Sequence, residues 1–293
     1  MYKYSTFLVF LIFSFSLSGQ ESSSQDLHNE LISNYNMYAP STLAAQAPGD
    51  VGYYNMSAGQ GVSDQAAAIN NAGFSPVQIF DLSEVELANI DVLIVDNPDN
   101  YSYGAEYLAQ LNVIENAVNN GLVLVMHDFY VTEAATVLPG GENISILREL
   151  SNDAVVDIQD NSTVITNGLD NASLDGGDSS SHGYAEANTL PANSLNILSR
   201  TDANESVTFV YPFGAGSVIY STIPVSHYYT RESPFALNTH IYMQNVVEYA
   251  ANLEDNAAAV PTLSQWAMIV LSLLLFIFGI SSFKSKQTNL AAC

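Results

Sequence analysis

The chain has 293 residues, of which 48% are hydrophobic, a composition that is typical of folded proteins and excludes general disorder. All 30 acidic side chains lie between residues 21 and 255, a stretch whose only bases are Arg148, Arg200 and Arg231, so its formal charge is −27 (three positive against 30 negative). Such a surface repels phosphate backbones, which excludes nucleic acid as a partner. The single cysteine, Cys293, is the last residue, which excludes an intrachain disulfide and a thiol nucleophile inside the body.

The first 20 residues have the three-part form of a secretory signal peptide. Lys3 supplies a positive charge, an apolar run starts at Phe7, and small residues follow around Ser18. The run is short for a membrane span, which needs about 20 residues, although a buried helix or an uncleaved anchor would look similar. We therefore predict a signal peptide at 1–20, followed by a polar linker at 21–48.

Residues 49–253 are long enough for one domain and alternate between strand-like and helix-like patterns. Strands are expected at 51–56, 76–81, 90–96 and 122–127, and helices at 63–71, after Ser83 and at 103–120. This alternation predicts a parallel sheet with helices on both faces. Later strands are expected at 195–199, 207–211 and 217–222, the last two joined by a hairpin, and a closing helix at 235–253.

After a linker expected at 254–259, the chain has no charged side chain from residue 261 to residue 283. This stretch is long enough to cross a bilayer, with Trp266 at one edge and Lys284 and Lys286 at the other. Because the signal peptide would export the acidic body, both lysines would remain in the cytoplasm before any processing, as the positive-inside rule requires. The alternative is a buried core helix, which would need something else to cover it.

The block that precedes this stretch resembles the IPTL-CTERM sorting signal of Gram-negative bacteria. The residues that carry the resemblance are Pro261, Thr262, Leu263, Ser264 and Trp266. Val260, Gln265 and Ala267 depart mildly from the family pattern, and the similarity covers residues 260–286 only. It implies recognition by a membrane-embedded sorting transpeptidase and attachment to the envelope, and it leaves open whether the helix is cut off.

The body is similar in its order of elements to class I glutamine amidotransferase-like domains. The segments that carry the similarity are 91–96, 120–127, 165–169, 213–220 and 245–250. The resemblance implies a flavodoxin-like three-layer αβα fold with a mainly parallel sheet. It is an argument for the fold and not for an activity.

The motifs of several enzyme classes are missing from the sequence. Working amidotransferases place a cysteine on the sharp turn after a central strand, whereas the corresponding turn here, residues 126–129, contains no thiol. The sequence also lacks a serine nucleophile elbow, a Walker A motif and a His-Glu-x-x-His motif. These absences favour a protein that is not an enzyme.

Polar residues nevertheless gather where the predicted strands end, which is where open α/β sheets bind ligands. Asp96, His127 and Asp128 are the candidate catalytic residues, because carboxylates with an imidazole could act as acid and base or bind a divalent metal. The alternative is that both aspartates bind loop amides and cap helices, and that His127 is a packing residue.

Four residues near the same strand ends are candidate binding residues, because tyrosine rings stack on sugars. They are Asp99, Tyr101, Tyr130 and His227. The acidic loop at 170–178 could hold calcium, but its spacing differs from that of an EF-hand, so a solvated loop is the favoured interpretation. His182 follows a run of serines and is expected to be exposed rather than to act as a ligand. No other cofactor is expected.

These patterns leave three hypotheses for the function. The first is an exported, envelope-anchored surface protein that has lost amidotransferase chemistry and binds or contributes to extracellular polymer such as polysaccharide. The second is a surface hydrolase that acts on a glycan-type substrate through Asp96, His127 and Asp128, with or without a metal. The third is a spacer that is presented on the cell surface.

Overall fold

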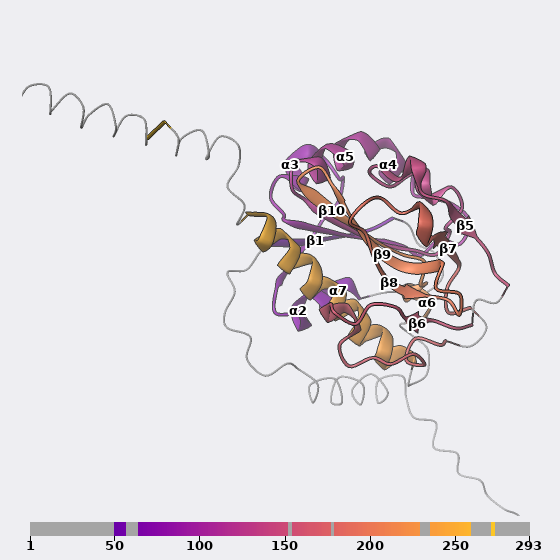
Figure 1. Ribbon diagram of the computed structural model, residues 1–293. Coiled ribbons are helices and arrows are strands. Elements are labelled where there is room, and N and C mark those ends of the chain that lie inside the picture. Colours follow the sequence, from indigo (N-terminus) through magenta and orange to yellow (C-terminus); the bar gives the residue numbers. More distant parts are fainter. Residues whose placement is uncertain are drawn as a thin grey trace, which may run out of the picture. The chain divides into compact units, whose positions relative to one another are not determined.

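The computed structural model describes residues 50–56, 64–151, 154–176, 179–228, 235–258 and 271–272 (Figure 1). The predicted signal peptide, the linker at 21–48 and the sorting residues from Pro261 to Trp266 lie outside these ranges. Within the described ranges, no helix combines the length and the apolar character that a membrane span requires. Nearly all described residues thus belong to the part of the chain between residues 50 and 258, which we call the body.

The first half of the body alternates between strands and helices, as predicted. Its elements are β1 (Asp50–Asn55), α2 (Gln65–Asn71), β2 (Ser75–Gln78), α3 (Glu84–Leu87), β3 (Val92–Asn97), α4 (Ala105–Ala109), α5 (Leu111–Asn119) and β4 (Val123–Asp128). Asp64 and Ser83 cap α2 and α3, because their side chains accept hydrogen bonds from the backbone amides of Ala67 and Glu86. Both caps confirm the expected helix starts.

The helix expected at 103–120 is interrupted. Gln110, with a φ of −104°, ends α4 and precedes α5, so the segment forms two separate helices. The end of α5 is as predicted, since Gly121 follows it with a φ of +127°, a conformation that glycine adopts at little cost.

The second half contains shorter strands and more loops. Its elements are η1 (Ala134–Thr136), η2 (Gly141–Asn143), β5 (Ile146–Arg148), β6 (Asp157–Ile158), η3 (Val164–Thr166), β7 (Gly183–Glu186), η4 (Ala187–Thr189), β8 (Leu195–Ser199), β9 (Glu205–Phe213), β10 (Gly216–Ser221), α6 (Val225–Tyr228) and α7 (Phe235–Ala258). Strands β8, β9 and β10 and the hairpin between the last two confirm the predictions. Strands β5, β6 and β7 were not anticipated from the sequence.

The sheet is mixed, which corrects the expectation of a mainly parallel one. Its strand order is β2-β1-β3-β4-β10-β9-β7-β5, and β8 pairs with both β9 and β6. Pairing is parallel from β2 to β10, whereas β10–β9, β9–β7, β7–β5, β8–β9 and β6–β8 are antiparallel. For β9 and β10 the reason is the tight turn at Gly214 (φ +61°), because a strand that returns through a short turn can only pair antiparallel.

Helices cover both faces of the sheet, which confirms the three-layer αβα arrangement. One apolar cluster joins Val92 and Val123 to Ile69 of α2 and Val246 of α7, and the other joins neighbouring strand residues to α3, α4 and α5. Figure 1 shows α2 and α7 on one side of the sheet and α3, α4 and α5 on the other. Each strand therefore directs alternate side chains into one core or the other.

Helix α7 closes the body. Val246 and Val247 of its predicted buried face are fully buried, while Ile241 and Tyr249 are half-buried. The helix continues to Ala258, so most of the segment 254–259, which we expected to be a linker, is helical.

Candidate functional site

The predicted catalytic residues lie at the carboxyl ends of neighbouring parallel strands. In the register of the sheet, Asp96 is opposite His127, Asn97 is opposite Asp128, and Ser221 is opposite His127. All five side chains are at most 2% exposed. The predicted site is thus a buried polar layer and not an open cleft.

This layer is divided between the two faces of the sheet. Successive side chains of a strand point to opposite faces, and His127 follows Met126, which lies in the core under α4 and α5. His127 and its register partner Asp96 therefore lie on the α7 face, whereas Asp128 lies on the α4–α5 face. The three candidate catalytic residues do not converge on one point.

Asp128 is the centre of a complete hydrogen-bond network on the α4–α5 face. One carboxylate oxygen accepts from Nδ2 of Asn97 (3.0 Å) and from the backbone amide of Tyr130 (2.9 Å). The other accepts from the hydroxyl groups of Tyr103 and Tyr220, each at 2.8 Å. This carboxylate joins β3, β4, β10 and the segment before α4. Its bond to the amide of Tyr130 is a loop contact of the kind that the alternative interpretation expected.

The pKa values of this network follow from burial. Desolvation raises the pKa of Asp128, and the hydrogen bonds from Tyr103, Val131, Tyr220 and Asn97 oppose that rise. Burial, with the neighbouring carboxylate, raises the pKa of Tyr103 and Tyr220 well above the ordinary value, so both remain donors.

His127 has a different environment on the α7 face. Its Nδ1 is buried and has no hydrogen-bond partner among the described residues, and its ring meets the ring of Tyr242 edge-on at 5.9 Å. Burial lowers the pKa of His127 to about 4, so the ring is neutral at pH 7. The hydroxyl group of Thr208 binds Ser221 and Tyr242, both at 3.0 Å, in the same layer.

The turn after β4 lies later than expected. Residues 126–128 belong to the strand, and the chain reverses at 129–133, where Val131 (φ +62°) and Glu133 (φ +61°) have left-handed backbone conformations. For a β-branched residue this conformation is strained.

The four candidate binding residues are not a single cluster. Asp99 binds the backbone amide of Tyr101 and the hydroxyl of Ser102, so it organises its own loop, and the Tyr101 side chain is 75% exposed. Tyr130 is half-buried and packs edge-on against Tyr103.

The remaining candidate, His227, is in α6. Its ring lies 5.8 Å from the ring of Phe129, in the turn after β4.

Near that turn is a group of residues that the sequence did not indicate. Arg148 and His182 both bind the backbone carbonyl of Phe129, through Nη1 (3.2 Å) and Nδ1 (3.0 Å) respectively. Arg148 also binds the carbonyl of Tyr130 and Oδ1 of Asn100 (2.6 Å). His182 is only 6% exposed, which corrects the expectation that it is exposed; it precedes β7, a strand that the sequence did not reveal.

Arg200 belongs to the same group. Its side chain is 1% exposed and binds Oγ of Ser181, next to His182, and the carbonyl of Glu149, next to Arg148. Burial, Arg148 and Arg200 together lower the pKa of His182 to about 4. The two arginines are the only arginine or lysine side chains among the described residues, and they flank one histidine.

The described part of the loop at 170–178 uses its oxygens within the protein. Asp170 binds the amide of Ala172 and the hydroxyl of Ser173, and Asp175 binds the amide of Val156. Among the described residues, no group of three or more His, Cys, Asp or Glu side chains could hold a metal ion.

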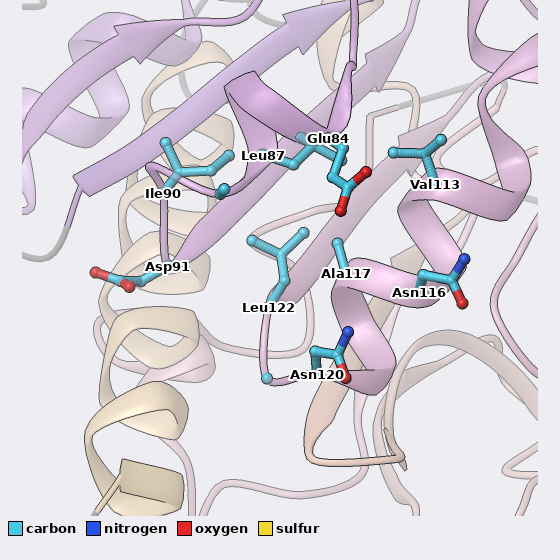
Figure 2. A pocket seen from close by; sticks show the side chains of 11 residues that line it. Glu84, Leu87, Ile90, Asp91, Val113, Asn116, Ala117, Asn120 and Leu122 are labelled. Carbon is cyan, nitrogen blue, oxygen red and sulfur yellow. The ribbon is translucent and has the colours of Figure 1, made fainter.

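A cavity of about 560 Å³ lies at the opposite end of the sheet, between α3 and α5 (Figure 2). Asp91 and Leu122 precede β3 and β4, so the cavity is at the amino ends of these strands. Glu84, Asn116 and Asn120 supply its polar groups. It is not connected with the predicted site.

Comparison with known proteins identifies the C-terminal motif. A family model described as the IPTL-CTERM motif matches residues 258–280. This match confirms the predicted sorting signal, and such a motif indicates an exported, surface-sorted protein that a sorting machinery recognises. The match covers the C-terminal end of the chain and not its body.

Solved structures share only a general likeness with the body. A cytoplasmic protein from Salmonella typhimurium has 13% identity and a TM-score of 0.47 over 69% of this chain and 98% of its own. A protein from Thermoplasma acidophilum that is provisionally described as part of a GMP synthase has 14% identity and a TM-score of 0.43 over 72% and 98%. An exo-β-1,4-mannosidase from Opitutaceae bacterium strain TAV5 has 9% identity and a TM-score of 0.40 over 70% and 36%. No curated protein matches the chain. These values are too low to assign a function.

Proposed function

We propose that this protein is an exported, envelope-anchored surface protein whose amidotransferase-like body no longer catalyses a reaction and instead binds extracellular polymer. The observation that carries the proposal is the IPTL-CTERM motif at 258–280. A protein that is sorted to the surface is exposed to extracellular polymers, which are therefore the partners that we propose for its acidic body.

The proposed anchoring uses both ends of the chain. A signal peptide at 1–20 starts export, and the apolar segment after Trp266 stops it, with Lys284 and Lys286 in the cytoplasm until a sorting transpeptidase acts.

The proposed loss of catalysis is supported by the turn after β4. In working amidotransferases this turn carries the nucleophile, whereas its strained residue here is Val131, which has no nucleophilic group. Asp128 also supports the proposal, because all its hydrogen bonds are to groups that hold the fold together.

The alternative function is a surface hydrolase that uses Asp96, His127 and Asp128 on a glycan-type substrate. The unpartnered Nδ1 of His127 favours it, since a buried nitrogen without a partner is often kept for a role other than stability. The burial of all three residues, and the position of Asp128 on the other face, weigh against it.

Sorting is tested by mass spectrometry of the envelope-associated protein. We expect a mature N-terminus near residue 20 and loss of surface protein in a Pro261→Ala, Trp266→Ala variant, with Val260→Ile as the control that stays at wild-type level. A mature chain that starts at Met1, or a double variant that is sorted normally, would refute the export scheme.

Catalysis is tested with the purified full-length protein and a panel of polysaccharides, with and without added divalent metal. We expect retention on at least one polysaccharide without release of product. Turnover that disappears in His127→Ala would establish the hydrolase instead, and the absence of retention on every polymer would leave the body a spacer.

A further inference from the structure

The positive charges of the described body are concentrated at one place. Arg148 and Arg200 flank His182, although the stretch that contains them has 30 acidic residues distributed along it. Side chains placed only to balance the acidic surface would be scattered over it. Both lie beside the turn after β4, next to the carboxyl ends of the strands, where open α/β sheets bind ligands. The charge of Arg200 interacts with the carboxylate of Glu149, so Arg148 is the arginine considered for a ligand.

Arg148 has N–H groups that bind no described residue, and none of its described partners is charged. Its described partners are the carbonyl groups of Phe129 and Tyr130 and the amide oxygen of Asn100, all of them neutral. No described group accepts a hydrogen bond from its Nε, and no described carboxylate pairs with it. A guanidinium that is held by neutral groups keeps its full charge and can bind a carboxylate through its free N–H groups.

His182 supplies a hydrogen-bond acceptor beside this charge. Its Nδ1 must carry the hydrogen, because its partner, the carbonyl of Phe129, can only accept. Its Nε2 therefore has the free lone pair, and burial, together with the adjacent arginines, lowers the pKa of the ring and keeps it neutral at pH 7. Since Arg148 and His182 bind the same oxygen at 3.2 and 3.0 Å, their bound nitrogens are at most about 6 Å apart.

We propose that Arg148, His182 and Tyr130 bind a sugar acid, namely a single uronic acid unit of an extracellular polysaccharide. Arg148 binds the carboxylate, His182 accepts a hydrogen bond from a sugar hydroxyl, and the half-buried ring of Tyr130, which lies 5.8 Å from the guanidinium, faces the sugar. The acidic surface around the site disfavours a densely charged polyanion, whereas an isolated uronate next to neutral sugars avoids that repulsion. This inference rests on the proposed function, because it names the polymer that the body binds.

The test is calorimetric titration of the full-length protein in detergent at pH 7 with methyl glucuronide, and with methyl glucoside as the uncharged match. We expect binding of the glucuronide only, at least about 10-fold weaker in Arg148→Gln and intermediate in Arg148→Lys, which keeps the charge but not the fork. Asn120→Asp, which changes net charge by the same amount in the cavity at the opposite end, should bind within twofold of the parent.

A second measurement needs no variant in the site. On addition of glucuronide, the imidazole NMR signals of His182 should shift more than those of the other four histidines. Equal binding by parent and Arg148→Gln, equal binding of glucoside, or an unshifted His182 would overturn the proposal. So would Arg148-dependent binding of sulfate or triglutamate that matches the glucuronide. Retention on a neutral polysaccharide without glucuronide binding would refute this site and leave the proposed function standing.

Discussion

The polar residues at the strand ends differ in their hydrogen bonding between the two faces of the sheet. On the α4–α5 face, both oxygens of Asp128 are occupied by donors from two strands and two loops. On the α7 face, His127 is as deeply buried, but its Nδ1 has no described partner. These two residues are adjacent in the sequence, but their environments differ. The carboxylate of Asp128 accepts hydrogen bonds that stabilise the fold, whereas the Nδ1 of His127 makes none with the described residues. Burial at a strand end does not by itself indicate a catalytic group.

The largest effect is expected from removing the centre of the network. Asp128→Ala leaves the donors from Asn97, Tyr103 and Tyr220 without an acceptor, which should lower the free energy of unfolding by about 4 kcal/mol in urea titrations. Asp99→Ala, which removes an aspartate that organises only its own loop, is the control and should cost about 1 kcal/mol or less. Similar losses in both variants would mean that Asp128 is not the tie described above.

The pH dependence of stability distinguishes the faces next. Burial lowers the pKa of His127 to about 4 in the folded protein, whereas the unfolded pKa is about 6.5. Protonation of His127 therefore favours the unfolded state, and the free energy of unfolding falls as the pH drops from about 6.5 towards 4. The decrease due to His127 amounts to about 3 kcal/mol. Asp128 acts in the opposite direction, because its raised pKa favours the folded state as the pH falls.

The difference between the parent and His127→Leu isolates the histidine. Urea unfolding at pH 7 and pH 4.5 should show a much smaller acid loss in His127→Leu than in the parent. An identical loss in both proteins would show that His127 is not desolvated in the folded state.

A smaller change should follow from trimming one donor of the network. Tyr220→Phe removes one hydrogen bond to a charged acceptor and should cost about 2 kcal/mol in urea. It should also raise the pKa of Asp128 further, because that hydrogen bond lowers it. The pKa is measurable from the carboxyl carbon signal of Asp128, and an unchanged pKa would contradict the assignment.

The smallest effect is expected on the other face. His127→Leu replaces a buried ring whose Nδ1 is unpartnered with an apolar side chain of similar size, so stability at pH 7 should stay within about 1 kcal/mol of the parent. A loss above about 3 kcal/mol would indicate a hydrogen bond to His127 that is made outside the described residues.

The sequence predicted much of the sheet because its signals there are local. Apolar runs before Asp96 and His127 marked β3 and β4, and Asp64 and Ser83 marked helix starts. It could not predict β5 or β7, which are too short for a periodic pattern; β7 pairs with the edge of β9, and β5 pairs with β7 in turn.

The candidate site was predicted in composition and not in geometry. We expected the strand to end at His127, but β4 continues through Asp128. Because successive side chains of a strand point to opposite faces, His127 and Asp128 lie on different faces of the sheet. The contact between Arg148 and His182 left no sequence signal, because the two residues meet only through the carbonyl of Phe129, which any residue would offer.

The most direct test of the account is a double-mutant cycle between Asp128 and Tyr220, measured by urea unfolding at pH 7. If the carboxylate is the tie between β4 and β10, Asp128→Ala and Tyr220→Phe should be coupled by more than about 1 kcal/mol, because each change removes the same hydrogen bond. A coupling energy near zero would contradict the claim that Asp128 serves the fold.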